Sequence, residues 1–164
     1  MKGMKVPMFK ENEMNKNDRK RNRKRKPMIE FILPCVLGYT NLPPADDMSM
    51  VLNAIRIVES SGNDSAVGDS GNAIGAFQIW EVYWMDATEF SGINGEYRDC
   101  YDRKYAERIV KSYMKRYATE KRLGRTVTVQ DIARIHNGGP NGYRKDSTLG
   151  YWKKVKKTMD ILDS

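Results

Sequence analysis

Residues 61–75 constrain the fold of this chain more than any other segment. They read SGNDSAVGDSGNAIG, in which glycine, asparagine, aspartate and serine surround the short apolar pairs Ala-Val and Ala-Ile. Residues of these types favour turns, and each apolar pair is long enough for only a short strand. The sequence therefore predicts one or two short strands here, a small β-hairpin at most, in a chain whose periodic segments are helical.

A helix is predicted directly before this segment. Apolar side chains recur at helical spacing between Met48 and Val58, which places them on one face. Gly62 is a natural stop for the helix. Its candidate N-caps are Asp46, Asp47 and Ser49.

Further helices are predicted downstream. Residues 101–118 carry tyrosines at four-residue steps, and a final helix covers about residues 147–162. The sequence from Thr128 to Asp131 has the pattern of a capping box, and the helix that it opens ends at the NGGP of residues 137–140. The aromatic-rich segment GAFQIWEVYWMDA is expected to be partly helical. We therefore predict an α+β fold that is predominantly helical.

Composition divides the chain into three parts. Residues 1–27 are basic and lack apolar periodicity, so we expect them to be disordered. Residues 28–45 hold the run FILPCVLGY, which fits either a secretory signal, with an extracellular product, or an apolar strip packed on the domain. Residues 46–164 are expected to form one domain. No stretch approaches the roughly 18 consecutive apolar residues of a membrane-spanning helix.

Charge is sorted along the chain. Residues 1–26 hold eleven basic and three acidic side chains and so account for the formal net charge of +8. Residues 27–100 have a net charge of −9 and residues 101–164 one of +9, so the second half can face an anionic polymer. The basic tail fits either a nucleic-acid-binding patch or a solvated leader. No aromatic residue follows Phe9 among its charges, which favours the leader.

Few residues are available for metal or redox chemistry. Cys35 and Cys100 permit one disulfide at most, and no disulfide framework. His136 is the only histidine, so neither a catalytic triad nor a histidine-based metal site can be assembled. We expect no metal and no cofactor.

Glu59 is the candidate catalytic acid. It follows Leu52 by seven residues and Ile55 by four, on the buried face of the helix's last turn. Apolar surroundings and the negative end of the helix dipole disfavour the ionised form of such a carboxyl, as a general acid requires. Hydrolysis of a glycosidic bond needs a second carboxylate, about 5 Å away if configuration is retained. Asp69 reaches that place if the hairpin folds back over the helix end, and Asp64 is the nearer alternative.

Five short sequence blocks, each present once, follow one another in an order that is typical of one protein family. They are ES at residues 59–60, GAFQI at 75–79, YWMD at 83–86, YMKRY at 113–117 and ARIHNGGPNG at 133–142. Over about residues 48–159 the chain resembles the invertebrate-type lysozymes, the group that includes destabilase. The resemblance implies a compact, mainly helical lysozyme-like fold with a small β-hairpin that lines the cleft.

The resemblance also implies an activity. It predicts a muramidase that cleaves the β-1,4 bond between N-acetylmuramic acid and N-acetylglucosamine in bacterial peptidoglycan, with chitin oligomers as a possible second substrate. Glu59 matches the family's acid and Asp69 its second carboxylate, although the spacing from Glu59 to the GAFQI block is shorter here than usual. A more distant likeness to bacterial lytic transglycosylases and goose-type lysozymes leaves open a mechanism that needs no partner carboxylate. A non-catalytic glycan-binding relative is a further alternative.

Several other residues of these blocks are candidates for substrate binding. Gln78 can hydrogen-bond sugar hydroxyl and acetamido groups or can tie its own loop. Tyr83 and Trp84 offer flat faces to sugar rings, but aromatic side chains in a small domain are more often part of the core. The candidate set is Ser60, Gln78, Tyr83, Trp84, His136 and Asn137.

The chain departs from the family pattern at three positions. Ala87 and Tyr143 stand where the family usually has cysteines, so the fold has to rest on its apolar core. Trp80 directly follows the Gln-Ile dipeptide, where destabilase-like members have the lysine of a proposed serine–lysine pair. Because this lysine is absent, we expect no isopeptidase activity. Separately, we expect the protein to act as a monomer.

Overall fold

The computed structural model describes residues 42–164 of the chain. The basic tail of residues 1–27, most of the apolar segment of residues 28–45, the possible signal and Cys35 therefore lie outside the described residues. None of the helices within residues 42–164 combines the length and the apolar character that a membrane span requires.

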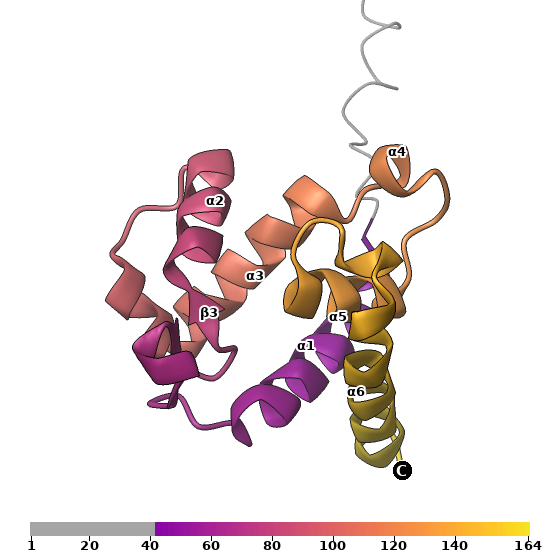
Figure 1. Cartoon of the computed structure of the whole chain (residues 1–164), viewed down its shortest axis with the longest axis horizontal. Helices are drawn as coiled ribbons and strands as arrows, with labels where there is room; N and C mark the ends of the chain where they lie inside the picture. Colours follow the sequence, from indigo (N-terminus) through magenta and orange to yellow (C-terminus); the bar gives the residue numbers. More distant parts are fainter. Residues whose placement is uncertain (1–41) are drawn as a thin grey trace, which may run out of the picture. The chain divides into compact units, whose positions relative to one another are not determined.

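Helices dominate the described part of the chain (Figure 1). The α-helices are α1 (Ala45–Ser60), α2 (Glu81–Ser91), α3 (Arg103–Tyr117), α4 (Glu120–Leu123), α5 (Val129–Gly138) and α6 (Leu149–Leu162). Short 3-10 helices connect them: η2 (Asp69–Gly71), η3 (Tyr97–Tyr101), η4 (Gly142–Arg144) and η5 (Asp146–Thr148). The predicted fold class, mainly helical with a small β element, is confirmed.

The β element is a small antiparallel sheet in the order β1-β2-β3. Its strands are β1 (Val67–Gly68), β2 (Ala73–Ile74) and β3 (Ile79–Trp80), with Val67 opposite Ile74 and Ala73 opposite Trp80. The sequence predicted at most two strands, so the third corrects that expectation. A strand of two residues is too short to show alternation of apolar and polar side chains, which is why sequence patterning missed it.

The start of α1 also corrects an expectation. The N-cap residue is Pro44, which makes no side-chain capping bond, rather than Asp46, Asp47 or Ser49. Asp46 and Asp47 instead lie inside the first turn, where their negative charge interacts favourably with the positive end of the helix dipole.

The end of α1 is set by backbone geometry. Ser61 adopts a left-handed conformation with φ of 54°, and its N–H bonds to the carbonyl of Ile57. Gly62, with φ of 79°, donates its N–H to the carbonyl of Arg56. These two bonds satisfy carbonyls that the last turn would leave free, so the helix stops directly after Glu59 and Ser60.

The start of α5 confirms the predicted capping box. The Thr128 side chain accepts from the backbone of Asp131, and the Asp131 carboxylate accepts from the backbone of Thr128. Asp131 is fully buried, and Arg125 binds it through two contacts of 2.7 Å. Burial alone would raise the pKa of Asp131, but the hydrogen bonds from Arg125 and Thr128 outweigh it and hold the pKa below its ordinary value.

One apolar core joins these elements. In Figure 1 the sheet and α2 lie on one side, α5 and α6 lie on the other, and α1 runs between them. Phe77, from the loop between β2 and β3, is almost fully buried and ties the sheet to the helices. Ala87 and Tyr143, which replace the expected cysteines, are both buried in this core. Its largest fully buried members include Leu52, Ile55, Ile79, Ile109, Met114, Ile132 and Ile135.

Two glycines give a matched test of this packing. A Cβ atom on Gly142 would lie 1.9 Å from the carbonyl oxygen of Arg134, whereas a Cβ on Gly150 would meet nothing within 4 Å. We expect Gly142→Ala to lower the free energy of unfolding by about 2 kcal/mol or more, because backbone has to move. Gly150→Ala, inside α6, should leave it unchanged or raise it by up to about 1 kcal/mol. Urea denaturation followed by circular dichroism measures both, and equal effects would contradict the packing described here.

Candidate active site

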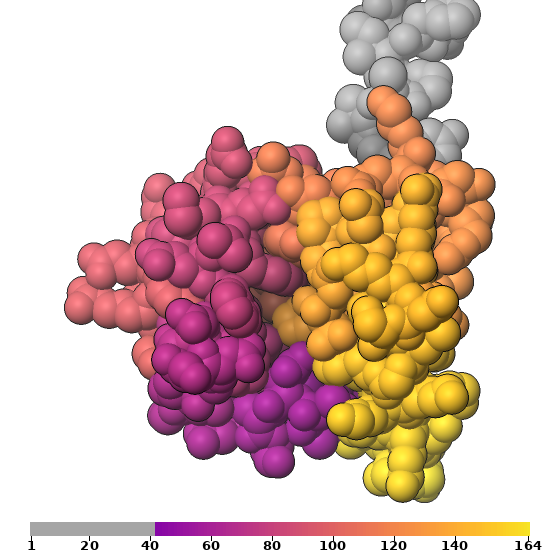
Figure 2. Space-filling view, viewed as in Figure 1, coloured from indigo at the N-terminus to yellow at the C-terminus, as the bar shows by residue number. Residues whose placement is uncertain are grey.

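A cleft of about 450 Å³ opens between the sheet and α2 on one side and α5 on the other. Figure 2 shows it as a hollow between the surface of residues near 60–90 and that of the C-terminal helices. Its lining residues are Glu59, Asp69, Gln78, Trp80, Val82, Tyr83, Asp86, Tyr113, His136, Asn137, Gly139 and Pro140. The structure thus brings both predicted carboxylates into one cleft, together with four of the six candidate binding residues.

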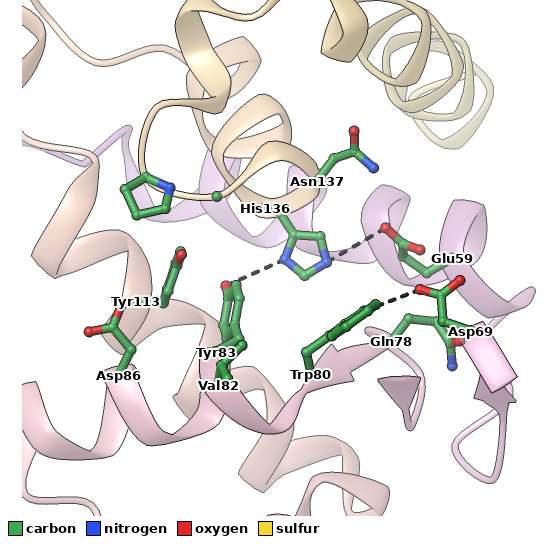
Figure 3. A pocket seen from close by; sticks show the side chains of 12 residues that line it. Glu59, Asp69, Gln78, Trp80, Val82, Tyr83, Asp86, Tyr113, His136 and Asn137 are labelled. Atoms are coloured by element: carbon green, nitrogen blue, oxygen red, sulfur yellow. Dashed lines mark hydrogen bonds and ion pairs between the residues drawn. The ribbon is translucent and has the colours of Figure 1, made fainter. Parts of the chain in front are cut away.

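Glu59 projects into the cleft from the last turn of α1 (Figure 3). Its side chain is 19% exposed. The hydroxyl of Tyr151, on α6, donates a hydrogen bond of 2.6 Å to Oε1 of Glu59. His136 Nε2 lies 3.7 Å from the same oxygen. Oε1 is therefore held by the protein, and Oε2 is the oxygen left for a ligand.

Tyr151 was not predicted from the sequence. Burial raises its pKa far above the ordinary value, and the charge of Glu59 and the hydrogen bond to it act in the same direction. The raised pKa keeps the hydroxyl protonated near neutral pH, where it donates to Glu59. Tyr151 lies 92 residues from Glu59 along the chain, and no local sequence pattern links the two.

His136 occupies the back of the cleft as a neutral imidazole. Burial lowers its pKa, and the Glu59 carboxylate and the Phe77 carbonyl only partly oppose this. Nε2 lies 3.0 Å from the carbonyl oxygen of Phe77, which can only accept, so this nitrogen carries the proton. Nδ1 is then an acceptor for the hydroxyl of Tyr83 at 3.4 Å. His136 thus links α5 to the sheet loop and to α2.

Asp69 comes from the turn between β1 and β2. Its backbone has φ of 46°, which few residues other than glycine adopt. The indole N–H of Trp80 donates to Asp69 Oδ2 at 3.1 Å, and the Asn72 side chain donates to the Asp69 carbonyl at 2.8 Å. These bonds hold the turn and orient the carboxylate toward the cleft (Figure 3).

Asp64, the alternative second carboxylate, lies elsewhere. Arg103 binds it through two contacts of 3.0 and 2.7 Å, and it does not line the cleft. A carboxylate with both oxygens paired to a guanidinium is a poor candidate for stabilising a second positive charge. The geometry favours Asp69.

Gln78 both lines the cleft and ties its loop. It has φ of 47°, and its side-chain amide donates to the carbonyl of Gly75 at 2.9 Å. Its side-chain oxygen lies so close to Gly68 that a Cβ there would come within 2.0 Å of it. Gly68, which has no side chain, therefore leaves the space that Gln78 occupies. Because Gln78 ties its loop and also lines the cleft, its structural role does not exclude a role in sugar binding.

The other wall of the cleft is aromatic. Tyr83 stacks on Tyr113, with ring centroids 3.6 Å apart and an interplanar angle of 14°. Asn137, at the end of α5, is exposed beside them. The cleft residues that sequence reasoning did not single out for binding are Trp80, Val82, Asp86, Tyr113, Gly139 and Pro140.

Ser60 and Trp84 are not among the residues that line the cleft, so the structure does not bring these two candidates together with the other four. The Ser60 hydroxyl donates to the Ala76 carbonyl at 2.9 Å and so joins the end of α1 to the sheet loop. The Trp84 indole N–H donates to the Tyr105 hydroxyl at 2.9 Å, and its ring packs against the core. Successive helical residues point about 100° apart, and here Tyr83 lines the cleft while Trp84 turns toward Tyr105 and the core.

The part of the chain from residue 42 onward contains no cluster of three or more His, Cys, Asp or Glu side chains that could hold a metal ion. Cys100 is buried, and this burial raises the pKa of its thiol to about 12.

The neutral state of His136 can be tested directly, because it is the only histidine of the chain. We expect its imidazole resonances to titrate with a midpoint below 6.5 in an NMR experiment, since burial disfavours the charged form. Below about pH 6.5 the unfolded chain binds a proton that the folded one does not. The free energy of unfolding should therefore fall as pH decreases from 6.5, and His136→Gln should remove this component. A midpoint at or above 6.5 would contradict the burial-stabilised neutral state described here.

Comparison with known proteins identifies a family and several relatives of this chain. Residues 49–158 match the family model described as Destabilase. A lysozyme from Meretrix lusoria is 42% identical over 84 residues, which cover 51% of this chain and 65% of that protein. An invertebrate-type lysozyme from Ruditapes philippinarum is 40% identical over 85 residues, which cover 51% of this chain and 58% of that protein. The aligned regions thus span less than two thirds of these relatives' own length.

A solved structure agrees as well. In the crystal structure of the Meretrix lusoria lysozyme in complex with Aeromonas hydrophila PliI, the matching chain has a TM-score of 0.56 and 38% sequence identity. The match covers 66% of this chain and 87% of that one. With the family model matched over most of the described residues, the chain belongs to the destabilase family, that of the invertebrate-type lysozymes.

Proposed function

We propose that this protein is a muramidase, which hydrolyses the β-1,4 bond between N-acetylmuramic acid and N-acetylglucosamine in bacterial peptidoglycan. The observation that carries the proposal is the environment of Glu59. Its carboxyl is four-fifths buried at a helix end, is held on Oε1 by Tyr151, and faces a cleft that also contains Asp69.

Glu59 is the proposed general acid. Its Oε2 carries the proton that passes to the leaving oxygen of the glycosidic bond. His136 is neutral and directs its N–H to the Phe77 carbonyl, so it adds no positive charge beside Glu59 that would favour the ionised carboxylate. Tyr151 keeps the carboxyl in one orientation.

Asp69 is the proposed second carboxylate. Its Oδ2 is occupied by the indole of Trp80, and Oδ1 is left to stabilise or capture the positively charged sugar centre of the transition state. Gln78, Tyr83, His136 and Asn137 are the proposed binding residues, and all four line the same cleft as the two carboxylates.

The family relationship supports this substrate class. Proteins named lysozyme from Meretrix lusoria, Ostrea edulis and Ruditapes philippinarum are about 40% identical to this chain over about half of its length. We propose that this protein likewise acts on bacterial cell walls, and hence outside the cell that makes it.

Substitution of the two carboxylates tests the mechanism. We expect Glu59→Gln to lower the rate of lysis of a peptidoglycan suspension by at least about 10²-fold, because the proton donor is lost. Asp69→Asn should also lower it strongly, and the wild type should release products with reducing ends. Asp64→Asn is the matched control and should retain activity, since Asp64 lies outside the cleft.

The product ends separate the alternatives. Activity that survives in Asp69→Asn, with anhydro sugar ends identified by mass spectrometry, would replace the two-carboxylate hydrolase by a transglycosylase. A wild type that binds the glycan and never cleaves it would refute the enzymatic proposal.

The role of Tyr151 has its own test. We expect Tyr151→Phe to lower kcat by about tenfold with little change in KM, because the lost bond orients the acid rather than the substrate. Tyr143→Phe is the control, because it removes a bond of another buried tyrosine, to the Arg122 carbonyl. Equal kinetic effects of the two changes would contradict an orienting role for Tyr151.

A further inference from the structure

Trp80 is the most exposed aromatic residue that lines the cleft. It ends β3, where its backbone pairs with Ala73, and it is 45% exposed. The other two tryptophans, Trp84 and Trp152, are half-buried and pack against the core. The other described residues therefore leave much of the Trp80 ring uncovered. The ring exposes a large apolar surface to the cleft.

The indole of Trp80 is also fixed in place. Its N–H donates to Asp69 Oδ2 at 3.1 Å, so the ring is held by the strand at one end and by the carboxylate at the other. Figure 3 shows the ring extending toward Asp69 within the group of cleft residues. Because its one polar atom is already bonded, the surface that remains open is the carbon surface of the ring.

The surroundings of this ring combine apolar and polar groups. Val82 adds an apolar side chain that is 70% exposed, while Gln78 and Asn137 bring amide groups to the same cleft. A sugar ring has an apolar face of C–H bonds and an edge of hydroxyl and acetamido groups. A rigid aromatic plane with nearby amides complements both, and the immobilised ring loses little freedom on binding.

We propose that Trp80, fixed by Asp69, is a sugar-binding platform of this cleft, which takes the apolar face of an N-acetylhexosamine ring beside the reacting bond. The proposal rests on the proposed glycan substrate and deepens it. Asp69 then has two functions, since one carboxylate oxygen positions the platform while the other faces the reacting sugar.

Binding measured without cleavage tests the platform. The probe is the linear tetramer of N-acetylglucosamine, titrated by calorimetry into protein carrying Glu59→Gln so that the ligand is not consumed. Adding Trp80→Ala should weaken binding about tenfold, and Trp80→Phe, which keeps an aromatic face, should recover most of it. Phe90→Ala is the matched control, because Phe90 is an exposed aromatic residue of α2 that does not line the cleft.

A second pair of changes separates the two functions of Asp69. Asp69→Asn keeps an oxygen that can accept the indole N–H, so binding of the tetramer should be retained. Asp69→Leu removes the acceptor and should weaken binding, and this effect should be smaller when Trp80 is already phenylalanine, which has no N–H to lose. Circular dichroism verifies that each variant is folded.

The outcomes distinguish this inference from the proposed function. Equal binding by Trp80→Ala and its parent, equal losses in Trp80→Ala and Phe90→Ala, or no binding of the tetramer by any variant would each overturn the platform. Cleavage of peptidoglycan by the wild type would stand in all three cases. Conversely, Trp80-dependent binding by a protein that never cleaves peptidoglycan would support the platform and refute the muramidase.

Discussion

The hydrogen bond between Tyr151 and Glu59 is the interaction on which the cleft depends. It joins the last turn of α1 to α6, two elements that lie at opposite ends of the described chain. On its other side the same turn is tied to the sheet loop by Ser60, which donates to the Ala76 carbonyl. The carboxyl of Glu59 is therefore fixed by contacts from both sides of the cleft, and small errors in such an orientation are costly for catalysis.

His136 provides the second link between the walls. Its two ring nitrogens bind the Phe77 carbonyl and the Tyr83 hydroxyl, and Tyr83 in turn stacks on Tyr113 of α3. A protonated imidazole would donate from both nitrogens, so the Tyr83 hydroxyl would have to turn its own proton away from His136 and accept instead. Burial keeps the ring neutral, so the connection between α5, α2 and the sheet loop does not change with small changes of pH near neutrality.

Sequence reasoning found the parts of the site that local patterns determine. Helical spacing from Leu52 and Ile55 identified the buried end of α1 and with it Glu59, and turn chemistry identified the segment of Asp69. It did not find Tyr151, because a contact over 92 residues leaves no local pattern. Trp84 was named with Tyr83 because both offer flat aromatic faces. Its place in the structure depends on the bond to Tyr105, 21 residues away, which the neighbouring sequence does not reveal. Trp80 was noticed only as the replacement of a lysine.

Backbone strain in this protein is concentrated around the cleft. Of the four non-glycine residues with positive φ in residues 42–164, Asp69 and Gln78 line the cleft, Ser70 follows Asp69, and Ser61 ends the helix that carries Glu59. Each such residue costs about 1 kcal/mol or more unless its surroundings hold it. Here bonds from Trp80 and Asn72 hold Asp69, and a bond to the Gly75 carbonyl holds Gln78. The three strands of two residues each supply few backbone bonds, so the sheet cannot carry this strain alone. The core residues of α1 and α5 and the side chain of Phe77 supply the packing against which this short, turn-rich segment is held.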